Sequence, residues 1–260
     1  MVNFIRKRVL SNELLFGLIM NLGSSLTVEM AGAAGYDWLW VDGEHGMGGF
    51  TDMVHQLQAA SATPAAPVVR VVWNDFPLIK RVLDMGASGV IVPWINRAED
   101  AAQVVRAMRY PPQGIRGVAR LLRGNAYGFE FDEYFARANQ ELLTAVQIET
   151  AEAITNADEI AAVEGVDALV IGPTDLSTSM GIFGQFTNPV LWEAFAKVAA
   201  ACKAHGKSAG ILLPALNDVD RLVEMGFRFI ATGADGSLLA NGMRANLDRC
   251  QQAREKLQGQ

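Results

Sequence analysis

The sequence predicts an α/β fold in which eight parallel strands close into a single-domain (β/α)8 TIM barrel. Short, nearly continuous apolar runs recur along the 260 residues, and each is followed by a turn signal and then by an apolar pattern of helical period. Such runs are typical of parallel strands covered on both faces, and eight units in about 250 residues suit a closed barrel. No internal repeat or low-complexity stretch divides the chain, so we expect one domain over residues 1–260.

Eight segments rich in β-branched and aromatic residues are the predicted strands. They cover residues 14–20, 38–41, 68–72, 89–92, 144–148, 168–171, 208–212 and 228–231. Asp75 and Pro77 predict the start of the helix after the third strand, and Asn96 with Glu99 predicts a capping box at the start of the next helix. The last helix is expected over residues 238–256.

Residues 110–141 form a long excursion between the fourth helix and the fifth strand. This link is far longer than the two to six residues, roughly, that usually join a helix to a strand, and it contains two adjacent prolines, several arginines and an aromatic cluster. One interpretation is a peripheral segment that makes subunit contacts. The other is a direct role in the functional site.

Composition excludes several classes of protein. The formal charge is -6, with both signs scattered along the chain, so we expect no nucleic-acid partner. No apolar stretch approaches the roughly 20 residues needed to cross a bilayer, so we expect no membrane partner. The two cysteines, Cys202 and Cys250, lie in helical patterns and give little support for a disulfide or a thiolate metal site. A cytoplasmic location fits best.

Polar residues collect where the predicted strands end. In a parallel barrel the loops that follow the strands converge at one mouth, where the working groups lie. The polar residues at these positions are Asp42, Glu44 and His45 after the second strand, Arg70 in the third, Gln147 and Glu149 at the end of the fifth, and Gly172, Thr174 and Asp175 after the sixth.

Glu149 and Asp175 are the candidate metal ligands. They follow strands five and six, which are neighbours in the barrel, and two hard oxygen ligands suit a divalent cation that keeps waters or substrate oxygens. The alternative is that each acid caps the helix that follows it.

His45 is the candidate proton-transfer group. It is one of three histidines, and its neighbours Asp42 and Glu44 favour the charged imidazole. Alternatively, the ring satisfies backbone groups of its own loop.

Arg70 places a charge inside an apolar strand, which is costly unless an anion or an ion pair receives it. A ligand oxyanion would serve, and a buried pair with Glu149 or Asp42 is the structural alternative. The backbone N–H groups near Gly172, Thr174 and Asp175 could receive a carboxylate.

These groups together imply aldol chemistry. A cation and a guanidinium would hold the oxygens of a 2-oxo acid while a base acts on the adjacent carbon, and the resulting enolate would form or break a carbon–carbon bond. None of the six lysines follows a predicted strand, which disfavours a Schiff-base mechanism.

The sequence resembles the metal-dependent (class II) pyruvate aldolases, a family that includes 4-hydroxy-2-oxoheptanedioate aldolase and 2-dehydro-3-deoxyglucarate aldolase, in the phosphoenolpyruvate/pyruvate barrel superfamily. The resemblance covers nearly the whole chain. It is carried by GYDWLWVDGEHG at 35–46, RYPPQGIRGVAR at 109–120, VQIETAEAI at 146–154, VEGVDALVIGPTDLSTSMG at 163–181 and GIL at 210–212.

The resemblance implies a role for most of these residues. Glu149 and Asp175 would bind Mg²⁺ or Mn²⁺, with Co²⁺ or Zn²⁺ as substitutes, and no organic cofactor is expected. His45 would be the base or proton shuttle, and Arg70 would hold the carbonyl or enolate oxygen. Gln147 would support the oxygen that Arg70 holds, and the N–H groups of Gly172, Thr174 and Asp175 would receive the carboxylate. Asp42 and Glu44 would surround these groups. Asp84 would orient His45, either within its own chain or from another subunit.

The resemblance also implies a homo-oligomer, commonly a hexamer, whose last helix can exchange between subunits. Two places depart from the family pattern: Thr174 stands where alanine is usual, and the sequence at 46–49 is unfamiliar. Leu212 could contact the aldehyde or simply belong to the barrel core.

The expected reaction is therefore reversible cleavage of a 4-hydroxy-2-oxo acid into pyruvate or hydroxypyruvate and an aldehyde. The alternatives are a related lyase that acts on an acyl-CoA thioester or phosphonate, and a catalytically silent binding or assembly protein.

Overall fold

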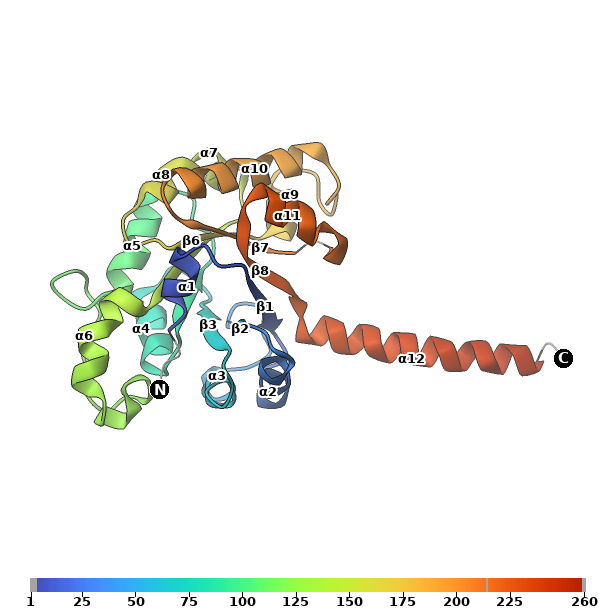
Figure 1. Ribbon diagram of the computed structural model, residues 1–260, viewed down its shortest axis with the longest axis horizontal. Helices are drawn as coiled ribbons and strands as arrows, with labels where there is room; N and C mark the ends of the chain where they lie inside the picture. Colours follow the sequence, from blue (N-terminus) through green and yellow to red (C-terminus); the bar gives the residue numbers. More distant parts are fainter. Residues whose placement is uncertain (1–3, 214, 259–260) are drawn as a thin grey trace.

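The computed structural model describes residues 4–213 and 215–258 as a closed barrel of eight parallel strands surrounded by helices (Figure 1). Each strand pairs with the next, and β8 returns to pair with β1. The strands are β1 (Leu15–Met20), β2 (Trp38–Asp42), β3 (Ala66–Arg70), β4 (Gly89–Val92), β5 (Leu143–Ile148), β6 (Ala168–Ile171), β7 (Ser208–Leu212) and β8 (Phe227–Ala234). The predicted fold class is confirmed. The predicted domain span also includes residues 1–3, 214 and 259–260, which lie outside the described residues.

The third strand begins and ends two residues earlier than the sequence predicts. It spans Ala66–Arg70, and Val72, which we expected inside it, is exposed. The apolar run therefore continues past the barrel wall, and Arg70 is the last residue of the strand rather than its middle. This shift places the guanidinium at the mouth.

Fourteen helical segments connect and cover the strands in the described part of the chain. They are α1 (Arg6–Leu10), α2 (Ser25–Ala34), α3 (Phe50–Ala60), α4 (Phe76–Asp84), α5 (Ala98–Met108), η1 (Arg123–Gly128), α6 (Phe131–Glu141), α7 (Ala151–Thr155), α8 (Ala157–Ala162), α9 (Pro173–Ser179), α10 (Pro189–Ala204), η2 (Leu216–Asp218), α11 (Val219–Met225) and α12 (Asp235–Gln258). No described helix is both long and apolar enough to cross a bilayer.

The helix starts test two sequence signals. Asp75 caps α4 as predicted, because its carboxylate accepts the N–H of Leu78 at 3.1 Å. The capping box predicted at Asn96 and Glu99 is wrong. Helix α5 begins one residue later, so the third helical position is Asp100, whose carboxylate accepts the N–H of Arg97 at 3.1 Å.

The long excursion contains η1 and α6, which pack on each other, while η1 also packs on α4. Arg123 attaches η1 to the barrel helices, because its guanidinium donates to the carbonyls of Met85 and Leu57 at 2.8 and 3.0 Å. The excursion is thus a folded layer on the side of the barrel that carries α4.

A stack of aromatic rings fills the barrel interior. The Trp38 ring stacks on Phe229 with centroids 3.8 Å apart and lies 5.9 Å from the Trp40 ring. Gly17 makes room for this stack, since a Cβ there would lie 2.3 Å from the Trp38 indole. The stack ends at Trp40, directly below the mouth.

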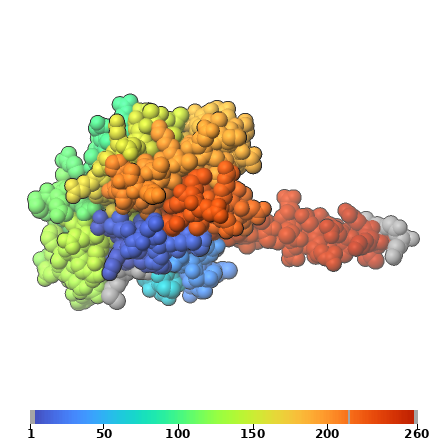
Figure 2. All heavy atoms as spheres, turned by 45° about the horizontal axis from the view of Figure 1, so that its top comes forward, coloured from blue at the N-terminus to red at the C-terminus, as the bar shows by residue number. Residues whose placement is uncertain are grey.

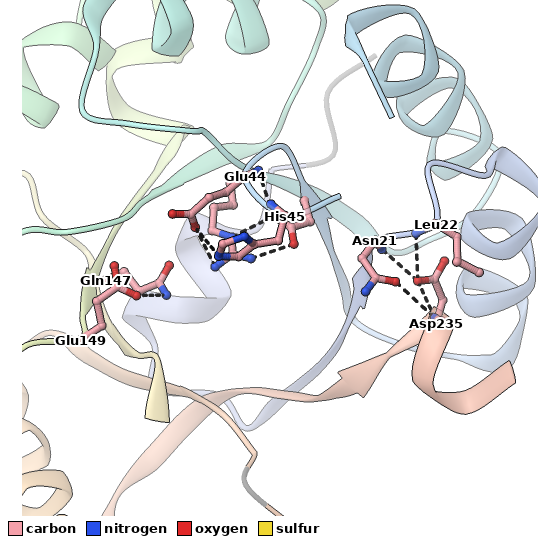
Figure 3. A network of polar contacts seen from close by, with 10 residues as sticks. Asn21, Leu22, Glu44, His45, Gln147, Glu149 and Asp235 are labelled. Carbon is pink, nitrogen blue, oxygen red and sulfur yellow. Dashed lines mark hydrogen bonds and ion pairs between the residues drawn. The ribbon is translucent and has the colours of Figure 1, made fainter. Parts of the chain in front are cut away.

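Helix α12 projects from the barrel, away from the other helices (Figures 1 and 2). Its first residue, Asp235, is buried and anchors the helix to the loop after β1. The Asp235 carboxylate accepts the N–H of Asn21 at 2.9 Å (Figure 3). It also accepts the hydroxyl of Thr27 at 2.6 Å. Beyond this anchor, side chains from Leu238 onward are exposed.

Candidate active site

A cavity of about 290 Å³ opens at the end of the barrel where the strands finish. It is lined by Ile19, Trp40, His45, Arg70, Gln147, Gly172, Pro173, Thr174, Asp175 and Leu212. Most of the residues that the sequence predicts for the site therefore line one cavity. Figure 3 shows Glu44, His45, Gln147 and Glu149 near one another at this mouth, with Asp235 set apart.

Arg70 is held in the plane of its guanidinium by two acids. Its Nε and one terminal nitrogen donate to the two carboxylate oxygens of Asp42 at 2.9 and 2.7 Å, and its other terminal nitrogen lies 2.9 Å from Glu44. The structural alternative of a buried pair is thus observed for Asp42 and not for Glu149. A guanidinium has five N–H donors, so about two remain for a ligand oxygen.

His45 lies in the loop after β2, which Asp42 shapes. The Asp42 carboxylate accepts the backbone N–H groups of Glu44 at 3.1 Å and His45 at 3.3 Å. The imidazole itself is largely exposed, and its Nε2 lies 3.9 Å from the Glu44 carboxylate. No hydrogen bond joins the His45 ring to a backbone group in the described residues, so the ring is available to a ligand.

Glu149 is buried directly after β5. One carboxylate oxygen accepts the backbone N–H of Trp94 at 2.7 Å, and the other accepts the side-chain amide of Gln147. Burial raises the pKa of Glu149 to about 7, and the negative charges of Glu44 and Asp175 act in the same direction. The hydrogen bond from Trp94 and the charge of Arg70 oppose this rise only in part.

Asp175 lies in the first turn of α9 and makes no hydrogen bond or ion pair within residues 4–213 and 215–258. Neither acid caps a helix, so that alternative is wrong. Thr150 caps α7 by accepting the N–H of Ala153, and α9 begins at Gly172, which has no side chain. Neither carboxylate is therefore committed to a helix N-terminus, although Glu149 accepts hydrogen bonds from Trp94 and Gln147.

Gly172 allows β6 to approach the acid and the amide of β5 closely. A Cβ there would lie 2.8 Å from the Gln147 side-chain nitrogen and 2.9 Å from a Glu149 carboxylate oxygen. The Gln147 side-chain oxygen is buried and has no hydrogen-bond partner among the residues that the structure describes. A buried polar atom in this state is costly, and a donor from a ligand or a bound water would satisfy it.

The donor set fits a divalent cation. Four carboxylates, from Asp42, Glu44, Glu149 and Asp175, lie at this mouth with one guanidinium, which interacts with the first three, so a formal excess of negative charge remains. Within the described residues no three His, Cys, Asp or Glu side chains group closely enough to form a complete metal site. Two protein carboxylates would leave positions for water and substrate, as is typical of Mg²⁺.

Asp84 does not lie beside His45 of the same chain. It is the last residue of α4, a helix that runs back from the mouth, so it lies near the opposite end of the barrel. There its carboxylate accepts a hydrogen bond from the buried Arg116 at 2.8 Å. Within one chain Asp84 therefore cannot orient His45, and a role in another subunit stays a prediction.

Two tryptophans at the site escaped the sequence analysis. Trp94 supplies the N–H that binds Glu149 from a backbone with φ of 57°, a conformation that no sequence signal indicates for tryptophan. Trp40 lies in a continuous apolar run, and such a run does not indicate which of its side chains project into the barrel and line the mouth. Both depend on tertiary structure that periodicity does not reveal.

The fold and the polar mouth define a barrel enzyme, and comparison with known proteins identifies the class. A family model described as HpcH/HpaI aldolase/citrate lyase matches residues 15–242. The chain belongs to this family. It is 40% identical over 233 residues, 90% of this chain and 91% of the relative, to a 5-keto-4-deoxy-D-glucarate aldolase of Salmonella paratyphi C. The protein is therefore an aldolase, a carbon–carbon lyase.

Solved structures agree with this assignment. A HpcH/HpaI family protein from Burkholderia cenocepacia is 38% identical with a TM-score of 0.91, covering 95% of this chain and 98% of that chain. A HpcH/HpaI aldolase from Desulfitobacterium hafniense is 30% identical with a TM-score of 0.89, covering 95% and 96%. The predicted family resemblance is confirmed.

Proposed function

We propose that the protein is a divalent-metal-dependent aldolase that reversibly cleaves 4-hydroxy-2-oxo acids into pyruvate, or hydroxypyruvate, and an aldehyde. The observation that carries this proposal is the uncompensated pair of acids, Glu149 and Asp175, beside an arginine that is already paired. Such a mouth stabilises a cation and the oxygens of a 2-oxo acid at the same time.

Glu149 and Asp175 would hold the metal ion, preferably Mg²⁺ or Mn²⁺. When bound, the ion would supply Lewis-acid stabilisation of negative charge on the substrate. It would also favour the ionised form of Glu149, whose pKa is raised in its absence. The lone carboxylate of Asp175 provides the second ligand without the loss of an existing hydrogen bond.

Arg70 and the loop after β6 would orient the substrate. The remaining N–H donors of Arg70 point the guanidinium charge at the oxo oxygen, and Gln147 supports that oxygen through its side chain. The backbone N–H groups of Gly172, Thr174 and Asp175 would receive the carboxylate. Leu212 would contact the aldehyde portion from β7.

His45 would move the proton. Its imidazole lies at the mouth and lines the same cavity as Arg70, so its Nε2 can take a proton from the carbon next to the oxo group or return one to it. The Glu44 carboxylate lies 3.9 Å from this nitrogen. No lysine lines the cavity, so no imine is proposed.

The relatives suggest a first substrate to test. Numbered from its other end, 5-keto-4-deoxy-D-glucarate is a 4-hydroxy-2-oxo acid, which is the class that this mouth fits. Its second carboxylate would extend from the reacting centre toward the aldehyde side of the cavity, where Thr174 adds a hydroxyl.

Deuterium exchange at the methyl group of pyruvate tests the proposal before any aldehyde is known. We expect exchange with Mg²⁺ or Mn²⁺ and its loss with EDTA, followed by cleavage of 5-keto-4-deoxy-D-glucarate under the same conditions. Exchange that is equally fast with EDTA would contradict the metal-dependent mechanism.

We also propose that the chain works in the cytoplasm as a homohexamer in which α12 exchanges between subunits. Support comes from the apolar side chains that α12 exposes: Leu238, Leu239, Met243, Leu247 and Leu257. Both cysteines are free, which suits a reducing compartment. Sedimentation of the full chain and of a chain ending before Met243 tests the assembly, since only the full chain should form the larger species.

A further inference from the structure

Trp40 is placed beneath the guanidinium that the proposed mechanism uses. Its indole is 1% exposed and lines the mouth cavity, and the Arg70 Cζ lies 5.1 Å above the ring centroid. Trp40 precedes Asp42 by two residues on β2, and alternate residues of a strand project to the same side. One strand therefore supplies both the ring below Arg70 and the acid at its edge.

We propose that Trp40 is a positioning residue that fixes the Arg70 guanidinium from below, an inference that rests on the proposed function of Arg70 in binding the 2-oxo acid. Asp42 and Glu44 hold the guanidinium within its plane but do not prevent it from tilting out of that plane. An aromatic face beneath the cation opposes this tilt, because the ring attracts the cation most strongly from directly below.

The position of Trp40 is itself well determined. Its ring packs against Trp38, which stacks on Phe229, and all three side chains are at most 1% exposed. A rigid support makes the arrangement of Arg70 independent of whether a ligand is present. The free N–H donors of Arg70 then face the cavity before the substrate arrives, which lowers the entropic cost of binding.

Trp38 gives a matched comparison for the alternative that Trp40 is only a core residue. Both tryptophans lie on β2, project to the same side, are buried, and leave the indole N–H without a hydrogen-bond partner. Only Trp40 lines the cavity and contacts Arg70. A packing defect alone would affect both positions, whereas a positioning role would be confined to Trp40.

The test compares Trp40→Leu, Trp40→Phe and Trp38→Phe by unfolding midpoint and by pyruvate affinity in the Mg²⁺-loaded protein, measured by calorimetric titration. We expect all three to lower the midpoint. Trp40→Leu should weaken pyruvate binding by roughly 3- to 30-fold, while the two phenylalanine variants, which keep a ring in the stack, should stay within about threefold. Should Trp40→Leu fail to fold, Trp40→Met also removes the ring face, and its flexible, unbranched side chain adapts better to the space.

A crystal structure of metal-free Trp40→Leu, or of Trp40→Met, adds a readout that does not depend on the proposed function. We expect the Arg70 side chain to leave its two-point contact with Asp42 in part of the molecules. An unchanged, single Arg70 conformation would overturn the inference whatever the protein binds, and so would equal losses of pyruvate affinity in Trp38→Phe and Trp40→Leu. Failure of wild-type protein to bind pyruvate would instead contradict the proposed function alone.

Discussion

The two sides of the mouth differ in how their charges are balanced. On the side of β2 and β3, Arg70 meets Asp42 and Glu44 at distances of 2.7 to 2.9 Å, so each charge has a partner. On the side of β5 and β6, Glu149 has only uncharged donors and Asp175 has no polar partner among the described residues. The first side is complete without a ligand, and the second is complete only with a cation.

This difference indicates that the side of Glu149 and Asp175 would contribute most of the free energy of cation binding. A buried carboxylate without a counter-charge costs free energy, which a bound cation returns. The paired side, in contrast, holds its geometry whether or not a ligand is bound. In the proposed mechanism, Arg70 would keep its position without a ligand, and affinity for the metal would come from relieving the electrostatic cost of the Glu149 and Asp175 carboxylates.

Substitution of Glu149 or Asp175, the two acids of the mouth without an ion-pair partner among the described residues, should have the largest effect on activity. We expect Glu149→Gln or Asp175→Asn to reduce metal-dependent pyruvate exchange about 1000-fold or more, because each removes a negatively charged ligand of the cation. The metal-free variants should be no less stable than wild type. Glu159→Gln, at an exposed acid on α8, is the control and should leave exchange unchanged. Full exchange in Glu149→Gln would refute the metal-ligand assignment.

Breaking the paired side should instead cost stability. Asp42→Asn leaves the buried Arg70 guanidinium without its two-point partner, and loss of one member of such a pair costs about 3 kcal/mol. Denaturant unfolding of the metal-free protein measures this effect. A comparable loss in Asp175→Asn would mean that the two sides do not differ as described.

The raised pKa of Glu149 also predicts how the stability of the metal-free protein depends on pH. The pKa of Glu149 is raised from 4.5 to about 7, so the folded state binds a proton that the unfolded state has released between these values. Stability should therefore be greatest below about pH 4.5 for this group and fall as the pH rises to 7, by on the order of 3 kcal/mol. Unfolding midpoints across this range test the slope, which Glu149→Gln should remove.

The smallest effect is expected at the close contact between β5 and β6, where Gly172 meets Gln147 and Glu149. In Gly172→Ala the new methyl would crowd Gln147 and Glu149 at 2.8 and 2.9 Å, while the backbone φ of −96° accommodates alanine. We expect pyruvate to bind the metal-loaded variant about tenfold more weakly. Gly242→Ala on α12, where a Cβ meets nothing within 4 Å, should bind as wild type does. Equal affinities in both variants would show that the close approach at Gly172 is not required.

The sequence predicted the barrel because its strands are covered on both faces and so read as continuous apolar runs. All eight were placed, but two of their C-terminal ends were wrong by more than one residue. The end of β3 at Arg70 was missed because Val71 and Val72 continue the apolar pattern beyond the strand, and β8 continues to Ala234, three residues past its predicted end at 231. Periodicity cannot show where a run leaves the barrel wall. That depends on pairing with the neighbouring strands, which end together at the mouth.

The residues of the site were predictable from their positions after the strands, but their partners were not. Asp42 and Arg70 are register partners of β2 and β3, and register is set by three-dimensional pairing rather than by local sequence. Asp84 shows the opposite error, because a residue predicted for the site lies far from the mouth of its own chain. A helix of nine residues carries its last residue about 12 Å from its first, so a residue at that end is remote from the mouth of its own chain.

In the assembly proposed above, the order of helix α12 would depend on the protein concentration. This helix has 24 residues, and after its anchor at Asp235 no other element covers its exposed side chains in the described structure. Most of the stability of a helix in a protein comes from the packing of its apolar face rather than from intrinsic helix propensity. On dilution, α12 should therefore fray while the barrel stays intact. The loss of helical circular dichroism would measure how far the order of this helix depends on contact with other subunits.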